Sequence, residues 1–228
     1  MARPGADTAS PPPLTDADLR DPVEDVAQRL LGCTLVGRDC AGVIVETEAY
    51  HQDEQACHAW KGRTPRTEQL FAASGTAYVY FTYGMHWCFN VVSEPDGIGA
   101  AVLIRALQPT HGLELMHARR ERARRPGSPP LADRHLCSGP AKLVQALDIR
   151  AADNGVELVG AYPTTAAALG DSRRDQPTLL RDAANVRAAG VDPASVVIGP
   201  RIGISVATEL PWRFGVAGNR WVSKPFAS

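Results

Sequence analysis

The chain has 228 residues, of which 44% are hydrophobic and 21% are charged, and its formal net charge is −1. This composition is typical of a globular protein with one well-buried core, and no apolar run approaches the roughly 20 residues that cross a bilayer. The near-neutral charge excludes a generally basic coat for nucleic acid but leaves room for a local basic face.

The first part of the chain, residues 1–13, is rich in Pro, Ala and Ser and has no apolar segment. We therefore expect a disordered lead-in and no secretory signal, followed by a single domain over residues 14–228. The five cysteines are scattered without a C-x-x-C pair, and the histidines lack metal-ligand spacing. These features predict free thiols in a reducing cytoplasm and no metal site.

The first predicted helix has Asp21 as its cap and Pro22 at its first helical position. Apolar residues then recur at helical spacing as far as Leu31, and Gly32 is expected to end the helix. A short strand over residues 34–36 follows.

Residues 43–50, Val-Ile-Val-Glu-Thr-Glu-Ala-Tyr, predict a β-strand rich in β-branched residues. Alternation places Glu46, Glu48 and Tyr50 on one side with Ile44, and the remaining residues on a plausible core side. From this stretch alone, an ordinary strand with one solvent-facing side is the simpler interpretation. A carboxylate beside an aromatic ring could instead activate a water while the ring holds a flat substrate.

Residues 51–66 have no clear period and predict a long loop, which at this length is often functional. His58 in this loop is compatible with simple solvation. Lys61, Arg63 and Arg66 lie on a turn-rich stretch and fit a phosphate contact, although a solvated cluster of cations is equally compatible with the pattern.

The next segment predicts a hairpin of two strands joined near residues 83–86, with a glycine in the turn. Tyr78 and Tyr80 share a face of the first strand, and Asn90 lies on the returning strand. A large aromatic residue at the tip, Tyr83, is hard to bury there, though it could fold back onto its own hairpin.

Residues 100–106 predict a strand in which Arg105 interrupts an apolar run, so the guanidinium needs a partner such as a carboxylate on an adjacent strand. Residues 112–125 predict an arginine-rich helix, and such a run is usually a solvent-exposed face. A further helix is predicted to open at Ser138-Gly139-Pro140 and to end near Leu147. Lys142 at its start suits an anion, or is simply one exposed lysine.

The last third of the chain is less informative and carries no repeat or second-domain boundary. Its predicted elements are a strand at 156–161, a flexible stretch at 172–177, a short helix ending before Gly190, and closing strands at 196–206 and 212–222, the last pair joined through Gly218-Asn219.

Taken in order, these motifs resemble the alkyladenine (3-methyladenine) DNA glycosylases. The resemblance runs from about Asp21 to Ser223 and depends on the succession of motifs at compatible spacing, because each motif alone is unspecific. The matching segments are V-E-T-E-A-Y at 45–50, His58, R-T-P-R at 63–66, Y-V-Y at 78–80, Y-G-M at 83–85, Asn90, L-I-R-A at 103–106, L-C-S-G-P-A-K-L at 136–143, P-R-I-G-I at 200–204 and P-W-R-F at 211–214.

The resemblance implies that Glu48 positions and deprotonates the attacking water, with Arg105 as its polar partner. It implies Tyr50 against one face of an extruded base and His58 and Tyr80 against the other. The remaining candidates are Asn90 on the pocket floor, where it would discriminate against the exocyclic amine of guanine, Tyr83 with Met85 as the wedge in the minor groove, and Arg63, Arg66 and Lys142 at the DNA backbone.

The chemistry of such an enzyme agrees with these residue types. A base must leave the stack before its glycosidic bond can be attacked, at a cost of a few kcal/mol, and an aromatic wedge offsets this by refilling the stack. Tyrosine rings attract a flat alkylated cation by ~0.5–2 kcal/mol more than the neutral base. Glu48 would activate water without a metal or cofactor, so we expect a monofunctional enzyme. A bifunctional one would need an amine, for which Lys142 is the candidate.

The patterns and the resemblance together predict an α+β fold, a single mixed domain with a curved, mainly antiparallel β-sheet flanked by helices. They predict a cytoplasmic monomer that acts on double-stranded DNA containing a damaged purine, is nucleoid-associated on DNA, and has no membrane partner. Two alternatives stay open, a non-catalytic module that binds damaged bases and an RNA-binding β-domain.

Overall fold

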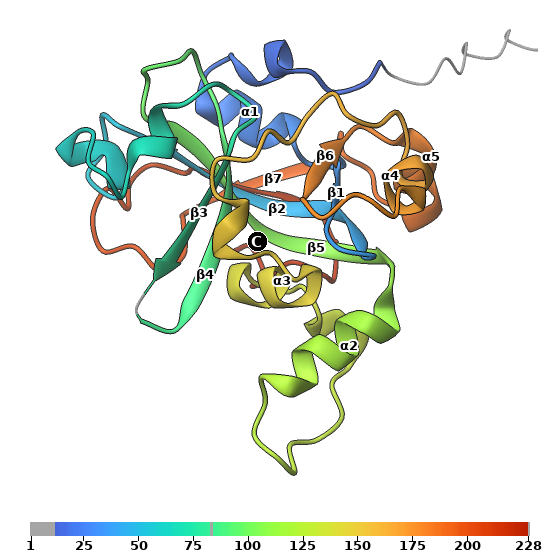
Figure 1. Cartoon of the computed structure of the whole chain (residues 1–228). Coiled ribbons are helices and arrows are strands. Elements are labelled where there is room, and N and C mark those ends of the chain that lie inside the picture. Colours follow the sequence, from blue (N-terminus) through green and yellow to red (C-terminus); the bar gives the residue numbers. More distant parts are fainter. Residues whose placement is uncertain (1–11, 83, 228) are drawn as a thin grey trace, which may run out of the picture.

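The computed structural model describes residues 12–82 and 84–227 and is built around one sheet with helices on both faces (Figure 1). All strand pairs in this sheet are antiparallel. This confirms the predicted α+β fold. Of the predicted lead-in, residues 1–11 lie outside the described residues. In the described part of the chain, no helix has the length and apolar character that a bilayer crossing requires.

Strand β2 (Ala41–His51) is the centre of the sheet. It pairs along its length with β5 (Ala100–His111), at its beginning with β1 (Thr34–Val36), and near its end with β8 (Arg213–Val216). The other strands are β3 (Ala77–Thr82), β4 (His86–Val92), β6 (Thr178–Leu180) and β7 (Val196–Gly199), in the order β3-β4-β5-β2-β1-β6, with β7 paired to β8.

Both faces of β2 are buried, so the interpretation of this strand as having one solvent-facing side is wrong. Every residue from Val43 to Ala49 is buried, including Glu46 and Glu48. Irregularities in the pairing with β5 lie between Ile44 and Thr47. A buried strand that carries two carboxylates must supply each with partners, and these define the site described below.

Helix α1 (Val23–Arg29) covers the upper face of the sheet in Figure 1 and buries Val23, Val26 and Ala27. It starts one residue later than predicted, since Pro22 occupies the cap position and Asp21 does not cap it. The carboxylate of Glu94 accepts a hydrogen bond from the Val23 N–H instead, at 2.9 Å. The chain leaves the helix before Gly32.

Helix α3 (Pro140–Leu147) packs on the lower face and begins and ends as predicted. Helix α2 (Leu113–Arg122) packs against α3 and is shorter than predicted. The interpretation of its arginines as a solvent-exposed face is wrong for two of them. Arg119 donates to the carbonyls of Arg38 and Ala146, at 2.9 and 3.0 Å, and Arg120 is buried against Gln145.

The segment after α3 departs most from the predictions. The predicted strand at 156–161 is reduced to an isolated bridge between Glu157 and Thr76. The stretch at 172–177 is anchored, because Arg174 donates to the carbonyls of Ala168 and Gly37 at 2.8 and 2.7 Å. Unpredicted strand β6 then extends the sheet beside β1.

The remaining helices are short. They are α4 (Thr165–Gly170), α5 (Ala183–Ala189) and the 3-10 turns Asp16–Leu19, His58–Lys61, Glu68–Phe71, Asp133–His135 and Ala151–Asp153. The closing strands β7 and β8 pair as predicted but are shorter, and Gly218-Asn219 follows β8 and does not join the two. The five cysteines are buried and unpaired.

Candidate active site

A cavity of about 280 Å³ opens between the β3–β4 hairpin, the end of β2, the start of α3 and residues 202–204. Its wall is largely aromatic and apolar with a few polar groups, which is the usual character of a small-molecule site. The side chains that matter below are Tyr50, His58, Tyr78, Tyr80, Asn90, Leu103 and Arg105.

One row of directly opposed residues crosses five strands, and three of its members, Tyr78, Asn90 and Leu103, line this cavity. Tyr78 on β3 faces Asn90 on β4, Asn90 faces Leu103 on β5, Leu103 faces Glu48 on β2, and Glu48 faces Arg213 on β8. Residues opposed in a sheet share a face. The sheet thus brings together side chains that are up to 135 positions apart in the chain.

Glu48 is fully buried behind the cavity wall and is held by three groups that line it. The Tyr50 hydroxyl and the Arg105 guanidinium donate to Oε2, at 2.8 and 3.0 Å, and the Ile202 N–H donates to Oε1 at 2.6 Å. Burial raises the pKa of Glu48, while Arg105 and the other two donors oppose that rise by stabilising the carboxylate.

Arg105 bridges this carboxylate to that of Glu46, as its position in an apolar strand predicted. Its Nε donates to Glu46 Oε1 at 3.1 Å. Glu46 Oε1 also accepts from Arg213 Nε at 2.7 Å and from the Ser223 hydroxyl at 2.8 Å. A buried guanidinium with two carboxylate partners has a fixed direction, so Arg105 presents Nη1 to Glu48.

The aromatic wall contains a contact that the sequence did not reveal. The Tyr78 hydroxyl lies 3.1 Å from Nδ1 of His58, and burial raises the pKa of Tyr78 to about 12, so it remains a phenol. Burial and the charge of Arg66 lower the pKa of His58, which favours the neutral ring. Tyr80 stacks on Tyr78 with ring centroids 5.2 Å apart and meets His58 edge-on at 4.5 Å.

Tyr50 is backed by Arg201, another residue for which the sequence alone predicted no role. The Arg201 guanidinium lies 4.7 Å from the Tyr50 ring centroid, is fully buried, and pairs with both oxygens of Glu54, at 2.6 and 3.1 Å. Arg201 does not line the cavity, whereas Tyr50 does. The only sequence signal for it was the P-R-I-G-I segment at 200–204.

The candidates for DNA contact lie around this cavity with different partners. Met85 is 68% exposed at the hairpin tip, next to Gly84 with φ +66°, while Tyr83 lies outside the described residues. Arg63 pairs with Glu68 at 3.0 Å, Arg66 reaches the Phe81 carbonyl at 3.5 Å, and Lys142 donates to the Ser138 hydroxyl at 3.3 Å. Lys142 therefore lies on the α3 side of the cavity, and both arginines lie in the loop after β2.

Comparison with known proteins decides the family. A sequence profile of the methylpurine-DNA glycosylases (MPG) matches residues 17–220. The chain belongs to this family. A Rhodopseudomonas palustris (strain ATCC BAA-98 / CGA009) protein named "Putative 3-methyladenine DNA glycosylase" is 45% identical over 222 residues, covering 97% of this chain and 93% of the relative. Relatives of the same name from Burkholderia lata and Bradyrhizobium diazoefficiens are 47% and 43% identical, covering 88% and 95% of this chain and 86% and 96% of theirs.

Membership of the methylpurine-DNA glycosylase family makes this chain a DNA glycosylase that acts in the repair of alkylated bases. The two alternatives from the sequence, a non-catalytic binding module and an RNA-binding domain, are therefore set aside. Base flipping is a general feature of such enzymes. Among residues 12–82 and 84–227, no group of three His, Cys, Asp or Glu side chains could hold a metal ion.

Proposed function

We propose that this glycosylase releases alkylated and deaminated purines, of the 3-methyladenine, 7-methylguanine and hypoxanthine type, from duplex DNA. The nucleotide is flipped into the aromatic cavity, and a water activated by Glu48 attacks the sugar carbon. Tyr50 stacks on one face of the base, His58 and Tyr80 contact the other, and Asn90 disfavours guanine. Tyr83 and Met85 fill the gap in the stack, and Arg63, Arg66 and Lys142 contact the backbone.

The observation that carries this proposal is the hydrogen bonding of Glu48. A carboxylate has about four lone-pair sites. Among residues 12–82 and 84–227, Oε2 accepts two hydrogen bonds and Oε1 accepts one, from the Ile202 N–H. Oε1 can therefore accept a further bond from a water. Because Arg105 and Tyr50 fix the orientation of the carboxylate, a water bound to Oε1 is held in one position relative to it.

The cavity chemistry supports a substrate of this class. An N-alkylated purine carries positive charge and is a good leaving group, so a placed base for the water is the main requirement. Tyr50 and Tyr80 offer electron-rich rings to such a cation, worth ~0.5–2 kcal/mol over the neutral base. A neutral deaminated purine must be protonated to leave, and the neutral His58 beside Tyr78 suits hydrogen bonding to it.

The test is a panel of duplexes that each carry one modified purine, assayed for base release. Glu48→Gln keeps the size of the side chain and removes its basicity, so release should fall by about 10²–10⁴-fold while binding to a damaged duplex persists. Undiminished release by Glu48→Gln would contradict the proposal.

The absence of a covalent intermediate is part of the same proposal. Borohydride should trap no adduct on damaged DNA, because water is the nucleophile. A trapped adduct that disappears in Lys142→Gln would show a bifunctional enzyme instead. The proposed monomer can be checked by light scattering with and without DNA, and the proposed cytoplasmic location by fractionation.

A further inference from the structure

Residues 223–226, near the end of the chain, contact the buried network behind Glu48. The Ser223 hydroxyl accepts a hydrogen bond from Arg105 Nη2 at 3.3 Å and donates one to Glu46 Oε1 at 2.8 Å. The Ser223 N–H donates to Glu46 Oε2. One residue near the end of the chain therefore contacts both the guanidinium that holds Glu48 and the carboxylate that holds this guanidinium. We call residues 223–226 the C-terminal clasp.

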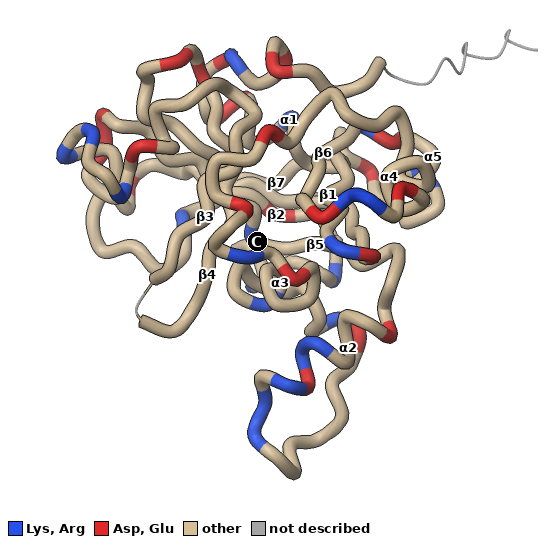
Figure 2. Tube along the Cα trace, viewed as in Figure 1, with Lys and Arg blue, Asp and Glu red and all other residues tan. Residues whose placement is uncertain are grey.

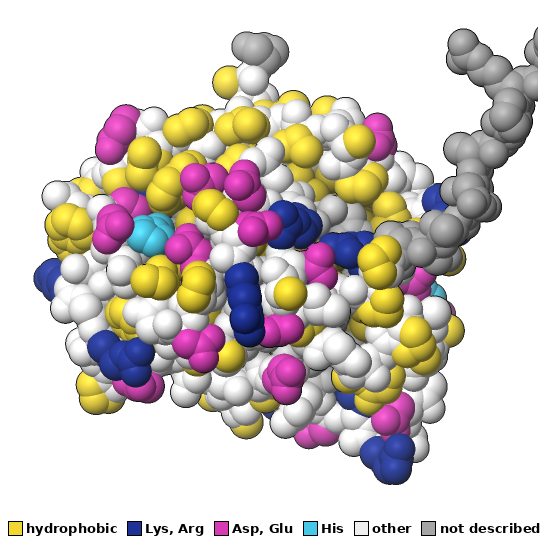
Figure 3. Space-filling model, turned by 90° about the horizontal axis from the view of Figure 1, so that it is seen from above, with side chains coloured by type: hydrophobic (Ala, Val, Ile, Leu, Met, Phe, Trp, Pro, Cys, Tyr) yellow, Lys and Arg dark blue, Asp and Glu magenta, His cyan; other side chains and the backbone are white. Residues whose placement is uncertain are grey.

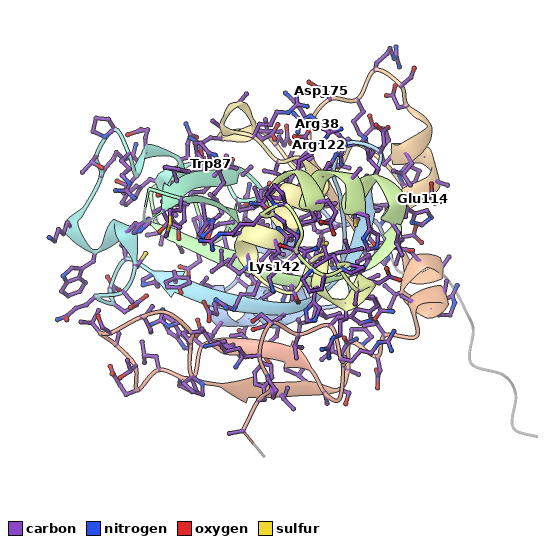
Figure 4. All side chains as sticks on the ribbon, turned by 90° about the horizontal axis from the view of Figure 1, so that it is seen from below. Arg38, Trp87, Glu114, Arg122, Lys142 and Asp175 are labelled. Carbon is purple, nitrogen blue, oxygen red and sulfur yellow. The ribbon has the colours of Figure 1, made fainter. Side chains whose placement is uncertain are left out.

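The clasp also covers the network from the side of β8. The Arg213 guanidinium lies 3.8 Å from the centroid of the Phe226 ring and donates to the Lys224 carbonyl. The ring packs against the backbone of Gly215, where a Cβ would clash with it. Gly215 lies directly opposite Glu46 in the sheet. Figure 4 shows β7 and β8, in pale red, beside β2, so the clasp packs on the outer side of these strands.

The network that the clasp covers is unusual in its burial. Charged side chains of both signs lie on the upper face of the molecule in Figure 3, and Figure 2 shows arginines at the end of α2 and in the following loop, at the bottom of the view. In contrast, Glu46 and Glu48 are fully buried, and Arg105 and Arg213 are 6% and 4% exposed. Two carboxylates face two guanidiniums, so the charges of the network balance. Such a group of charges is stable only while each member keeps its partners.

The hydrogen bonds distinguish the roles of the two carboxylates. Glu46 accepts four, from Arg105 Nε, Arg213 Nε, and the hydroxyl and N–H of Ser223. A carboxylate has about four lone-pair sites, so the donors to Glu46 match its capacity. These bonds assign Glu46 to holding the two guanidiniums in place, and Ser223 supplies half of them.

We propose that the C-terminal clasp fixes the direction of Arg105, and that Ser223 is a positioning residue that acts through Arg105 on Glu48. The inference rests on the proposed function, in which Glu48 activates the water. The Ser223 hydroxyl holds Nη2 of Arg105 while Nη1 donates to Glu48. Without this hydroxyl, Nη2 loses its acceptor and Glu46 loses a donor. Arg105 is then drawn toward Glu46, and its bond to Glu48 weakens.

The groups around Glu48 determine what such a change does to its protonation. The nearest charged or titratable side chains are Arg105, Arg213, Glu46, Tyr50, Tyr80 and Cys88. Farther off are the cavity residues His58 and His86, and Arg201 with its partner Glu54. Burial raises the pKa of both tyrosines and of the cysteine thiol, so these groups stay neutral. The cation that bonds to Glu48 is Arg105, whose charge lowers the pKa of the carboxyl group.

Ser223→Ala tests the proposal, because it removes the hydroxyl and leaves the N–H that bonds to Glu46. Single-turnover release from a 7-methylguanine duplex should be slower than in the wild type by about 2–10-fold at neutral pH. The fall in rate at low pH should move to a higher pH, because a weakened Arg105 bond lets the pKa of Glu48 rise. Affinity for a duplex with a tetrahydrofuran abasic site should stay at the wild-type value, since Ser223 does not line the aromatic cavity.

Two further serine variants separate positioning from a structural effect. Ser223→Thr keeps the hydroxyl and should restore the wild-type pH profile. Ser74→Ala is the matched control, because it removes a buried hydroxyl that donates to the Asp16 carbonyl at 3.1 Å, away from the cavity. It should leave the profile unchanged. A Ser223→Ala profile equal to that of Ser74→Ala would overturn the proposal.

A double variant tests whether Ser223 acts through Arg105. In the Arg105→Gln background, Ser223→Ala should cause no further shift of the pH profile, because the guanidinium that it positions is gone. A full additional shift would show that Ser223 acts by another route, and the proposal would be wrong.

Phe226→Ala tests the clasp at a second position. Loss of the ring exposes Arg213, and the pH profile should move in the same direction as in Ser223→Ala. Ile198→Ala, at a side chain on β7 that is 56% exposed, is its control and should not move the profile. If Phe226→Ala matches Ile198→Ala, the ring has no part in positioning Arg105. Glu48→Gln separates this inference from the proposed function, because loss of release in Glu48→Gln with unshifted profiles for Ser223→Ala and Phe226→Ala would reject the clasp alone.

Discussion

The guanidinium of the buried Arg201 lies 4.7 Å from the centroid of the Tyr50 ring. Both carboxylate oxygens of Glu54 accept hydrogen bonds from this guanidinium. Its neighbour Ile202 donates the backbone N–H that holds Glu48. Two consecutive residues therefore support the proposed stacking ring and the proposed base of the reaction. The loop that carries them is part of the proposed catalytic geometry, although it lies outside the main strand pairings.

Removing Arg201 should destabilise the fold strongly. Arg201→Met leaves Glu54 buried without its partner, for which we expect a loss of about 3–5 kcal/mol in the free energy of unfolding. Denaturant unfolding measures this loss. Arg201→Met combined with Glu54→Leu should recover part of it, and Arg63→Met, which breaks the exposed pair with Glu68, should lose less than about 1 kcal/mol. Equal losses for the buried and the exposed pair would contradict this account.

The pH dependence of base release should follow the carboxyl group of Glu48. Only the carboxylate can accept the proton of water, so the rate on a cationic lesion falls as the pH drops through the pKa of Glu48. Because burial raises this pKa, the fall begins at a higher pH than for an ordinary glutamate. A neutral lesion needs protonation as well, and should give a bell-shaped profile.

Arg105→Gln should shift the fall in rate at low pH to a higher pH than in the wild type. The charge of Arg105 lowers the pKa of Glu48, so its removal leaves burial less opposed. A pH–rate profile on a 7-methylguanine duplex measures the shift. If the rate fell at the same pH as in the wild type, a group other than Glu48 would control the pH dependence of base release.

Tyr78→Phe tests whether the orientation of His58 matters to the reaction. The change removes one hydrogen bond to Nδ1, worth about 0.5–1.5 kcal/mol, or roughly 2–10-fold in rate. We expect the loss in single-turnover release of hypoxanthine to exceed that of 7-methylguanine, since in the proposed function the hydrogen bond from His58 serves the neutral base. Tyr162→Phe is the control, because it removes a similar bond, to Asp171, away from the cavity.

Arg38 offers a comparison of two carboxylates on one guanidinium. Asp153 is 1% exposed and bonds to Nη1 and Nη2, at 3.0 and 2.9 Å, whereas Asp175 is 75% exposed and bonds to Nε (Figure 4 labels Arg38 and Asp175). Asp153→Ala should cost about 3–5 kcal/mol of unfolding free energy, because Arg38 stays buried. Asp175→Ala should cost less than about 1 kcal/mol. Urea unfolding of both variants tests the ranking, and a reversed order would refute it.

The sequence by itself was sufficient for features that depend on local pattern. The β-branched run around Glu48 predicted the central strand, the glycine-containing turn predicted the β3–β4 hairpin, and Pro140 predicted the start of α3. The arginine in an apolar strand also predicted its own carboxylate partner. Each of these features follows from the backbone preferences of the residues, or from the free-energy cost of burying a charge without a partner. Both apply in any fold.

Only the tertiary structure decided which residues complete the site. Glu48 and Ile202 are 154 positions apart, and Glu46 and Ser223 are 177 apart, so no local pattern links them. For the same reason β6, the Tyr78–His58 contact and the burial of both faces of β2 were not predicted. Strand pairing and packing bring such residues together when the sheet forms around β2. Their positions in the sequence do not show that they will be in contact.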